Sequence, residues 1–340
     1  MRAAVHTRYG PPEVVRVTKV PRPAVRDDEV LVRIHVTTVN RTDCGFRAAK
    51  PFVARFFTGL WRPRVTVMGN EFAGEVVACG GAVRSFEVGD RVFGYNEGPF
   101  GAHAEYLAIS EGASLSTIPD GVTFVEAAAS TEGAHYALSF IRAAKVRAGQ
   151  SVLVNGATGA IGSAAVQILR SLGAKVTAVC AAPQAELVRQ LGADRVIDYT
   201  SQDFTDDDHT YAVVLDSVGK SSFGRCRRLL EPRGVYLSSE LGPFGQNPIL
   251  ALLTPLFRRR RVLFPIPKHD RATVEYLREL LESGDFSPVI DRRYPLEEIV
   301  AAYRYVETGQ KIGNVVITIQ DQSATTNHGP QASDREERGS

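Results

Sequence analysis

A glycine-rich turn between a predicted strand and a predicted helix is the strongest chemical signal in the sequence. The apolar stretch 151–154 has the pattern of a buried strand, and a helical pattern covers 161–172. Glycines in such a turn let the backbone approach a pyrophosphate closely, and the free N–H groups at the helix start can bind it. Glycines that serve only helix–strand packing are the alternative. The turn predicts a dinucleotide site, with the candidate contacts Gly156, Thr158, Gly159, Ala160, Ile161 and Gly162.

The end of the next predicted strand favours NADPH over NADH as the cofactor. An NAD site usually has an acidic residue there, about 20 residues after the glycine turn, to bind the ribose hydroxyls. Here strand 175–180 is followed by Ala-Ala-Pro, and the first acid is Glu186. No charge at this place would repel a 2′-phosphate. Arg189 and Arg195 are the nearby cations, although either could be a solvated charge on a helix or loop.

The strand and helix patterns on either side of this turn predict an α/β fold with two domains. Residues 30–37 alternate with period two, and glycine turns break up the first 120 residues, so a β-rich domain is expected there. Thr123 and Glu126 have capping-box spacing before an Ala-rich helical stretch that reaches about Lys145. Strands and helices then alternate, which predicts a doubly wound parallel sheet. The expected strands are 151–154, 175–180, 196–198, 212–216, 235–238 and 315–319, and the expected later helices are 161–172, 183–191, 221–230, 271–282 and 296–307.

Composition excludes several classes of function. The chain has 340 residues, 44% hydrophobic and 23% charged, with a net charge of +2, so we expect neither nucleic acid nor a membrane as a partner. The four cysteines form no CxxC motif, which argues against a zinc ribbon or a disulfide framework. The N-terminus has no apolar signal core, and the apolar stretch 249–257, followed by the basic run 258–261, is too short to span a bilayer. We therefore predict a reduced, cytoplasmic protein with a disordered polar tail over 321–340.

Several different short motifs follow one another along the chain in a defined order. They are VNRTDCGFR (39–47), GNEFAGEV (69–76), VGDRVFG (88–94), AEY (104–106), the glycine turn, LGAD (191–194), VIDY (196–199) and IGNVV (312–316). Together they resemble the medium-chain dehydrogenase/reductase superfamily, in its zinc-free quinone oxidoreductase-like branch. The resemblance implies a GroES-like catalytic domain over 1–122 and 266–320, a Rossmann nucleotide-binding domain over 123–265, a small-molecule substrate and a homodimer.

Departures from the family pattern bear on the metal and the cofactor. Zinc-dependent relatives have Cys and His where this chain has Asn40 and Asn70, and an amide is a poor zinc ligand, so we predict a metal-free protein. Tyr199 matches a position that contacts the cofactor phosphate in the family, and Asn314 stands where the family's C-terminal cofactor-contacting motif often has Lys. The carboxyl ends of the predicted strands add the candidate cofactor contacts Ser217, Val218 and Ser238.

Three residues are candidates for the chemistry itself. Asn40 could donate an amide hydrogen bond in the nicotinamide or substrate pocket, or it could cap a turn. Arg47 could orient a carbonyl or an anion, or it could form a structural ion pair. His103 could donate a proton, or it could pack on a strand.

Hydride transfer needs orientation and stabilisation of a developing oxyanion more than acid–base machinery. A quinone or an α,β-unsaturated carbonyl gives a phenolate or an enolate, which needs a metal less than an alkoxide does. The sequence therefore predicts an NADPH-dependent, zinc-independent oxidoreductase that acts on such acceptors. An NADPH-binding scaffold or sensor with little turnover, and an NAD(P)-dependent alcohol or aldehyde oxidoreductase, are the alternatives.

Overall fold

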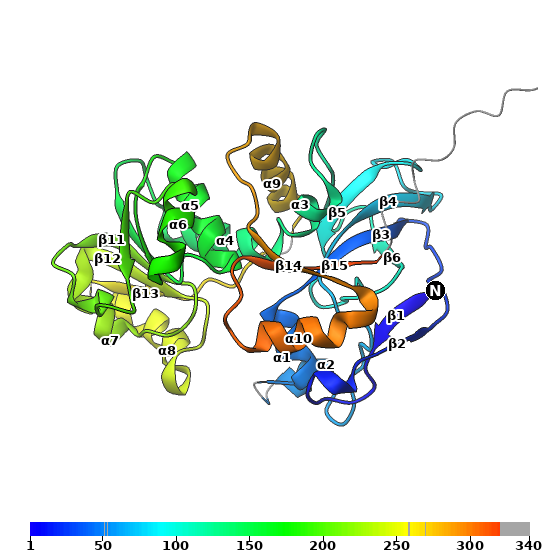
Figure 1. Cartoon of the computed structure of the whole chain (residues 1–340), viewed down its shortest axis with the longest axis horizontal. Helices are drawn as coiled ribbons and strands as arrows, with labels where there is room; N and C mark the ends of the chain where they lie inside the picture. The colour runs from blue at the N-terminus through cyan, green and yellow to red at the C-terminus, as the bar shows by residue number, and fades with distance from the viewer. Residues whose placement is uncertain (51, 53, 258, 269, 320–340) are drawn as a thin grey trace, which may run out of the picture.

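The computed structural model describes residues 1–319 except 51, 53, 258 and 269. The tail predicted over 321–340, and Arg258 of the basic run, lie outside the described residues. The chain forms two lobes side by side, each built on its own β-sheet (Figure 1). Within the described residues, no helix is both long and apolar enough to span a bilayer.

A six-stranded parallel sheet forms the lobe on the left of Figure 1. Its strand order, β10-β9-β8-β11-β12-β13, is the 3-2-1-4-5-6 order of a doubly wound nucleotide-binding sheet. The predicted parallel sheet is therefore confirmed, and β13 is an edge strand that the sequence pattern missed. Its strands are β8 (Ser151–Asn155), β9 (Lys175–Cys180), β10 (Arg195–Asp198), β11 (Tyr211–Asp216), β12 (Leu230–Ser238) and β13 (Arg261–Leu263).

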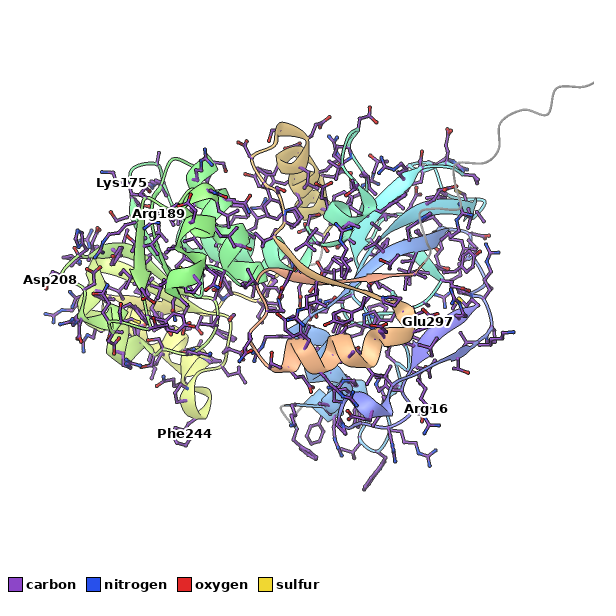
Figure 2. All side chains as sticks on the ribbon, viewed as in Figure 1. Arg16, Lys175, Arg189, Asp208, Phe244 and Glu297 are labelled. Carbon is purple, nitrogen blue, oxygen red and sulfur yellow. The ribbon has the colours of Figure 1, made fainter. Side chains whose placement is uncertain are left out.

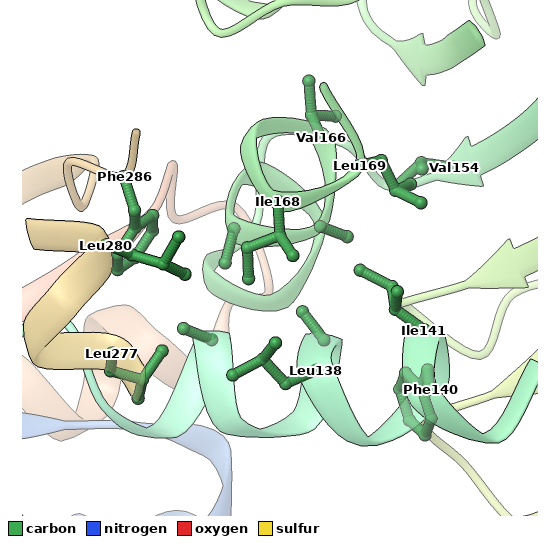
Figure 3. Packing of buried hydrophobic residues seen from close by; sticks show 14 of the residues in the cluster. Leu138, Phe140, Ile141, Val154, Val166, Ile168, Leu169, Leu277, Leu280 and Phe286 are labelled. Carbon is green, nitrogen blue, oxygen red and sulfur yellow. The ribbon is translucent and has the colours of Figure 1, made fainter. Parts of the chain in front are cut away.

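Helices cover both faces of this sheet, which explains why its strands are almost continuously apolar. On β8, Val152 and Val154 face one hydrophobic cluster and Leu153 faces another. Figure 3 shows the first cluster, where Leu138 and Ile141 of α4 pack against Ile168 of α5. The helices of this lobe and its border are α4 (Glu132–Ala144), α5 (Ala160–Ser171), α6 (Ala185–Gln190), α7 (Phe223–Cys226), α8 (Gln246–Leu253) and α9 (Arg271–Ser283).

A seven-stranded, mostly antiparallel sheet forms the second lobe. β15 pairs with β3, so the C-terminal part of the chain returns to the sheet that the N-terminal part begins. The parallel sheet is thus inserted between two halves of the other one. The strands are β3 (Glu29–Val39), β4 (Glu71–Cys79), β5 (Arg91–Tyr95), β6 (Tyr106–Ser110), β7 (Leu115–Thr117), β14 (Ile290–Pro295) and β15 (Asn314–Thr318), with β1 (Arg2–Val5) and β2 (Arg16–Lys19) forming a separate ribbon.

The prediction of one Ala-rich helix after Thr123 is wrong in one respect, because this stretch forms two helices. Thr123 and Glu126 do form a capping box at the start of α3 (Phe124–Ala128), but the chain turns before α4 begins. The break is fixed by a residue far away in the sequence: the Glu71 carboxylate accepts hydrogen bonds from Thr131 Oγ1 (2.9 Å) and from the Glu132 backbone N–H (2.6 Å). A buried acid from β4 therefore fixes where α4 starts, which no local pattern indicates.

Three further helices lie on the second lobe: α1 (Arg41–Ala48), α2 (Ala54–Thr58) and α10 (Ile299–Glu307). The sequence pattern missed α1, although its start is well marked. Asn40 and Asp43 form a capping box there, in which each side chain binds the backbone N–H of the other residue. This cap fixes Asn40 at the border between the two lobes.

Candidate active site

The glycine turn has the geometry expected of a dinucleotide site. Gly156 has a φ of +79°, and a Cβ there would lie 2.3 Å from Val218, so the tight turn after β8 requires glycine. Gly159 is the N-cap of the twelve-residue helix α5, and no side chain caps this end of the helix. The free backbone N–H groups at the start of α5 therefore face the cleft beside the turn and suit a pyrophosphate.

An elongated cleft starts at this turn. Its outer part has a volume of about 400 Å³ and lies at the carboxyl edge of the parallel sheet, where such sheets bind nucleotides. Tyr199, Lys220 and Arg225 line it, together with Asp203. Arg225 forms an ion pair with Asp203, while Lys220 is exposed, so this end of the cleft carries an excess of positive charge.

The inner part of the cleft, about 160 Å³, shares Gly159, Val218, Gly309 and Lys311 with the outer part, so the two are continuous. It passes between the lobes, and the residues that line it from the second lobe include Asn40 and Thr42. A wider chamber of about 590 Å³ follows, and it shares Thr42 and Tyr136 with the inner part. The cleft therefore leads from the glycine turn into a space between the lobes that can hold a second molecule.

Close packing of two helix starts shapes the inner cleft. A Cβ on Gly133 would lie 2.7 Å from the backbone of Ala160, so only glycine lets α4 approach the start of α5. This contact brings Glu132 and Tyr136, one helical turn apart on α4, to the inner cleft. Neither residue was predicted, and their only sequence signal is the i, i+4 spacing of two polar side chains on an otherwise Ala-rich helix.

The inner cleft has unusual electrostatics. Burial raises the pKa of Glu132 well above its usual range, and the neighbouring Glu71 carboxylate adds to the effect. Burial lowers the pKa of Lys311, which the acids Glu132 and Glu71 oppose. The Lys311 ammonium group donates to the Gly313 carbonyl oxygen, and the Gly313 N–H donates to the Thr158 carbonyl oxygen (2.7 Å). The segment before β15 is thereby fastened to the glycine turn.

Most of the predicted site residues come together in this cleft. It is lined by Asn40, Gly156, Thr158, Gly159, Ala160, Ile161, Tyr199, Ser217 and Val218. Within the described residues, Gly162, Ser238 and Asn314 do not line it. Ser238 is buried and Ser239 lines the cleft in its place, while Asn314 Nδ2 donates to the Val289 carbonyl oxygen (3.1 Å) and Lys311 lines the cleft instead.

Asn40 lies where the two lobes meet. Its Oδ1 accepts from the Asp43 N–H (2.9 Å), and its Nδ2 donates to Asn70 Oδ1 (2.6 Å). The two positions at which zinc-dependent relatives place Cys and His are thus held by amides that bind one another. Such a pair of neutral amides does not fit a zinc ion, and no group of three His, Cys, Asp or Glu side chains in the described part of the chain could hold a metal.

Arg47 and His103 lie behind the cleft rather than in it. The fully buried Arg47 forms an ion pair with Glu307, donates to the Gly10 carbonyl oxygen (2.8 Å) and stacks over the Tyr303 ring. These contacts join α1 to α10 and to the N-terminal segment, so the structural alternative for Arg47 is the one its surroundings favour.

His103 is also fully buried. Its Nε2 donates to the Thr38 carbonyl oxygen (2.7 Å), and its Nδ1 accepts from the Tyr303 hydroxyl (3.3 Å). Asp43 Oδ2 is 3.8 Å from Nε2. With both ring nitrogens engaged and no access to the cleft, His103 has the surroundings of a core histidine.

This burial predicts a pH effect on stability. Burial lowers the pKa of His103 to about 4 in the folded protein, from 6.5 in the unfolded chain. The neutral His103 therefore contributes fully to the free energy of unfolding above pH 6.5. This contribution, about 3 kcal/mol, is lost as the pH falls to about 4. Chemical denaturation of wild type and His103→Gln across this range should give a shallower loss in the variant. His209 is exposed, so His209→Gln is the control. Equal slopes for wild type and His103→Gln, or the same change in His209→Gln, would contradict this assignment.

Of the two arginines considered near the cofactor, neither lines the cleft. Arg195 forms an ion pair with Asp207 (2.6 Å), and Arg189 interacts with Glu186 (3.7 Å). Figure 2 shows Arg189 on the outer part of the parallel-sheet lobe. Besides Lys311, the cations that line the outer cleft are Lys220 and Arg225, which follow β11 instead of β9.

Two family models match the chain. The alcohol dehydrogenase GroES-like domain matches residues 26–120, and the zinc-binding dehydrogenase model matches residues 191–317. A quinone oxidoreductase from Pseudomonas aeruginosa is 31% identical over 324 residues, which cover 91% of this chain and 97% of that protein. The chain belongs to the medium-chain dehydrogenase/reductase superfamily, in its quinone oxidoreductase-like branch.

Two plant proteins are also similar to this chain. The 2-methylene-furan-3-one reductase of Solanum lycopersicum is 31% identical, covering 93% of this chain and 79% of the relative. The chloroplastic NADPH-dependent alkenal/one oxidoreductase of Arabidopsis thaliana is 29% identical with the same coverage. The solved quinone oxidoreductase from Coxiella burnetii shares the fold, with a TM-score of 0.84, 24% identity, and 94% of this chain and 99% of that chain covered. This chain is an NAD(P)H-dependent oxidoreductase.

Proposed function

We propose that this medium-chain reductase transfers hydride from NADPH to a quinone or to an α,β-unsaturated carbonyl compound, without zinc. The observation that carries the proposal is the continuous cleft, which runs from the glycine turn past Asn40 into a chamber large enough for an acceptor. The names of its relatives, which include a quinone oxidoreductase and an NADPH-dependent alkenal/one oxidoreductase, support this choice of acceptors.

The residues of the outer cleft fit a dinucleotide with a 2′-phosphate. Gly156, Thr158 and the start of α5 would hold the pyrophosphate, and Tyr199, Lys220 and Arg225 lie around the adenosine end. Asp203, a carboxylate that lines this end of the cleft, forms an ion pair with Arg225. Lys220 therefore adds a positive charge that Asp203 does not balance. A phosphate is the ligand that such a charge excess favours.

The inner cleft would place the nicotinamide between Asn40, Thr42 and Glu132. When bound, the nicotinamide supplies the hydride, so the protein has to orient the acceptor and stabilise the enolate or phenolate that forms. Asn40 Nδ2 donates to Asn70 Oδ1 (2.6 Å) and to Glu71 Oε2 (3.4 Å), so Asn40 offers its Oδ1 as an acceptor at this point, while Thr42 offers a hydroxyl group. The paired amides of Asn40 and Asn70 take the place of a metal. We therefore assign the orienting role to Asn40.

Substitution of Asn40 separates this role from its structural one. Ser keeps an N-cap oxygen but lacks the Nδ2 group that donates to Asn70, so Asn40→Ser should melt close to wild type while kcat falls about 10-fold. Asn40→Ala loses both contacts and should be about 1 kcal/mol less stable as well. NADPH affinity, measured by nucleotide fluorescence, should change less than about 3-fold in both. A full rate in Asn40→Ser would remove Asn40 from the site.

The test of the proposed function is NADPH oxidation by protein dialysed against EDTA, with quinones, enals and simple aldehydes as acceptors and NADH alongside. The proposal expects turnover with a quinone or an enal and faster turnover with NADPH than with NADH. Turnover with simple aldehydes alone would favour an alcohol or aldehyde oxidoreductase. Tight NADPH binding without turnover on any acceptor would favour a scaffold or sensor.

A further inference from the structure

Exposed aromatic side chains gather on the second lobe, on the segment between α1 and β4. Phe52 and Phe56 are 62% and 65% exposed, and Trp61 is 87% exposed. Leu60 beside it is 42% exposed. We call these four residues the aromatic patch. None of them lines the cleft or the chamber, and large apolar side chains that lie together in water mark a surface for an apolar partner.

The N-terminal segment holds the aromatic patch in place. The Tyr9 hydroxyl donates to the Gly59 carbonyl oxygen (2.8 Å) and bonds Thr58 Oγ1 (2.7 Å). The Arg64 N–H donates to the Thr58 carbonyl oxygen (2.8 Å), which closes a loop directly after α2. Trp61 is at the tip of this loop. The loop is tied at its base, so it presents the indole ring to the solvent instead of burying it.

Cations accompany the aromatic patch, and acids do not. Between Cys44 and Asn70 the chain has five Lys or Arg residues and no Asp or Glu. Lys50, Arg62 and Arg64 are exposed, and no carboxylate in the described part of the chain forms an ion pair with them. The patch therefore combines apolar rings with positive charge that nearby acids do not balance. An anionic partner with an apolar interior matches both properties.

The aromatic patch lies on the edge of the molecule at which the chamber opens. Lys50 lines the chamber, and Phe52 follows two residues later. Helices α1 and α2 lie at the lower edge of the second lobe, beneath α10 (Figure 1). Phe244 of the other lobe is fully exposed and projects from the lower edge in the same view (Figure 2). A flat partner on this edge would therefore contact both lobes.

We propose that the aromatic patch and its cations bind the surface of an anionic lipid bilayer. Trp and Phe side chains are favoured at the boundary between headgroups and acyl chains, and Lys50, Arg62 and Arg64 can bind acidic headgroups. A second copy of this chain matches less well, because a symmetric contact would bring these cations together. The proposal goes beyond the proposed function and does not depend on it.

This proposal revises our expectation that the protein has no membrane partner. That expectation came from the net charge of +2, which describes the chain as a whole. Acids elsewhere in the sequence balance the local excess of cations, so composition alone does not show it. The exposure of the four apolar side chains also becomes visible only in the structure.

Trp61 is the only tryptophan of the chain, so its fluorescence reports on this surface alone. Vesicles of phosphatidylcholine with about 30% phosphatidylserine should shift its emission to the blue and protect it from quenching by acrylamide. Vesicles of phosphatidylcholine alone should have a much smaller effect, and about 0.5 M NaCl should reverse most of the change. Co-sedimentation with the same vesicles, without NADPH or acceptor, gives the affinity.

Variants separate the contribution of charge from that of the indole ring. Each cation near an anionic surface contributes about fivefold to affinity, so Arg62→Glu combined with Arg64→Glu should weaken binding at least about 25-fold. Trp61→Ser should weaken binding about 10-fold. The controls are Lys175→Glu on the other lobe and Val88→Ser, whose side chain is 66% exposed on a turn. Both should bind like wild type, and all variants should melt close to wild type.

Other results would overturn the proposal. The absence of both the blue shift and co-sedimentation with anionic vesicles would exclude the bilayer as the partner. Equal binding to neutral and anionic vesicles, or equal losses in the controls, would show non-specific adsorption. Binding that the Arg62, Arg64 and Trp61 variants do not weaken would place the contact on another surface. A dimer in solution that Phe56→Ser converts to a monomer would assign the patch to a second copy. None of these measurements uses turnover, so each result leaves the proposed function untouched.

Discussion

Gly159→Asp should weaken NADPH binding at least 100-fold while leaving the fold intact. Gly159 has φ −72° and ψ 170°, which any residue can adopt, and a Cβ there would meet only the Gly156 carbonyl oxygen at 3.6 Å. An aspartate therefore fits, and its carboxylate enters the space at the start of α5. A negative charge there repels the pyrophosphate and binds the N–H groups that would otherwise hold it.

Fluorescence titration with NADPH and thermal melting measure the two halves of this prediction. Gly159→Ala adds a methyl group without a charge and should cost less than about 10-fold in affinity. Gly81→Asp places the same charge on an exposed turn where a Cβ meets no atom within 4 Å, and it should change nothing. NADPH affinity in Gly159→Asp within 3-fold of wild type would show that the cofactor does not use this turn.

Lys220→Glu should reverse the cofactor preference. A charge-assisted hydrogen bond to phosphate contributes about 1.5–3 kcal/mol, and reversing the charge adds repulsion, so NADPH affinity should fall about 100-fold. NADH lacks the 2′-phosphate, and its affinity should change less than about 3-fold. The effect on the ratio of the two dissociation constants is therefore the quantity to measure.

A matched control is Lys175→Glu. Lys175 is exposed at the amino end of β9, on the outer part of the same lobe (Figure 2), whereas the cleft lies at the carboxyl edge of the sheet. This control should leave both dissociation constants unchanged. If Lys220→Glu weakens NADH and NADPH equally, Lys220 contacts a part of the cofactor common to both, and the preference for the 2′-phosphate has another source.

The parallel sheet could be predicted because its signals are local. The strands predicted at 175–180 and 212–216 correspond to β9 and to most of β11, since each is an apolar run between turn residues. The break between α3 and α4 could not be predicted, because it depends on Glu71, which is some 60 residues away in the sequence. Helix α1 could have been found from the Asn-x-x-Asp spacing at its start, which is a weaker form of the usual capping box.

The site residues divide in the same way, into those with a local sequence signal and those placed by contacts between distant segments. The glycine turn and Asn40 lie in motifs with recognisable spacing, and both line the cleft. Tyr136 and Lys311 reach it only because α4 packs on α5 and because the C-terminal segment hydrogen-bonds to Thr158. Sequence alone also could not distinguish a catalytic arginine from Arg47, whose partner Glu307 is 260 residues away.

The most direct test of the proposed reaction is a turnover with NADPH deuterated at the nicotinamide C4, on each face in turn, by EDTA-dialysed protein with an enone as acceptor. The account predicts a saturated ketone with deuterium on the β-carbon, from one face only, and none on the carbonyl carbon. Deuterium on the carbonyl carbon of an alcohol product would contradict conjugate reduction. Activity that disappears with EDTA and returns with zinc would contradict the role assigned to Asn40 and Asn70.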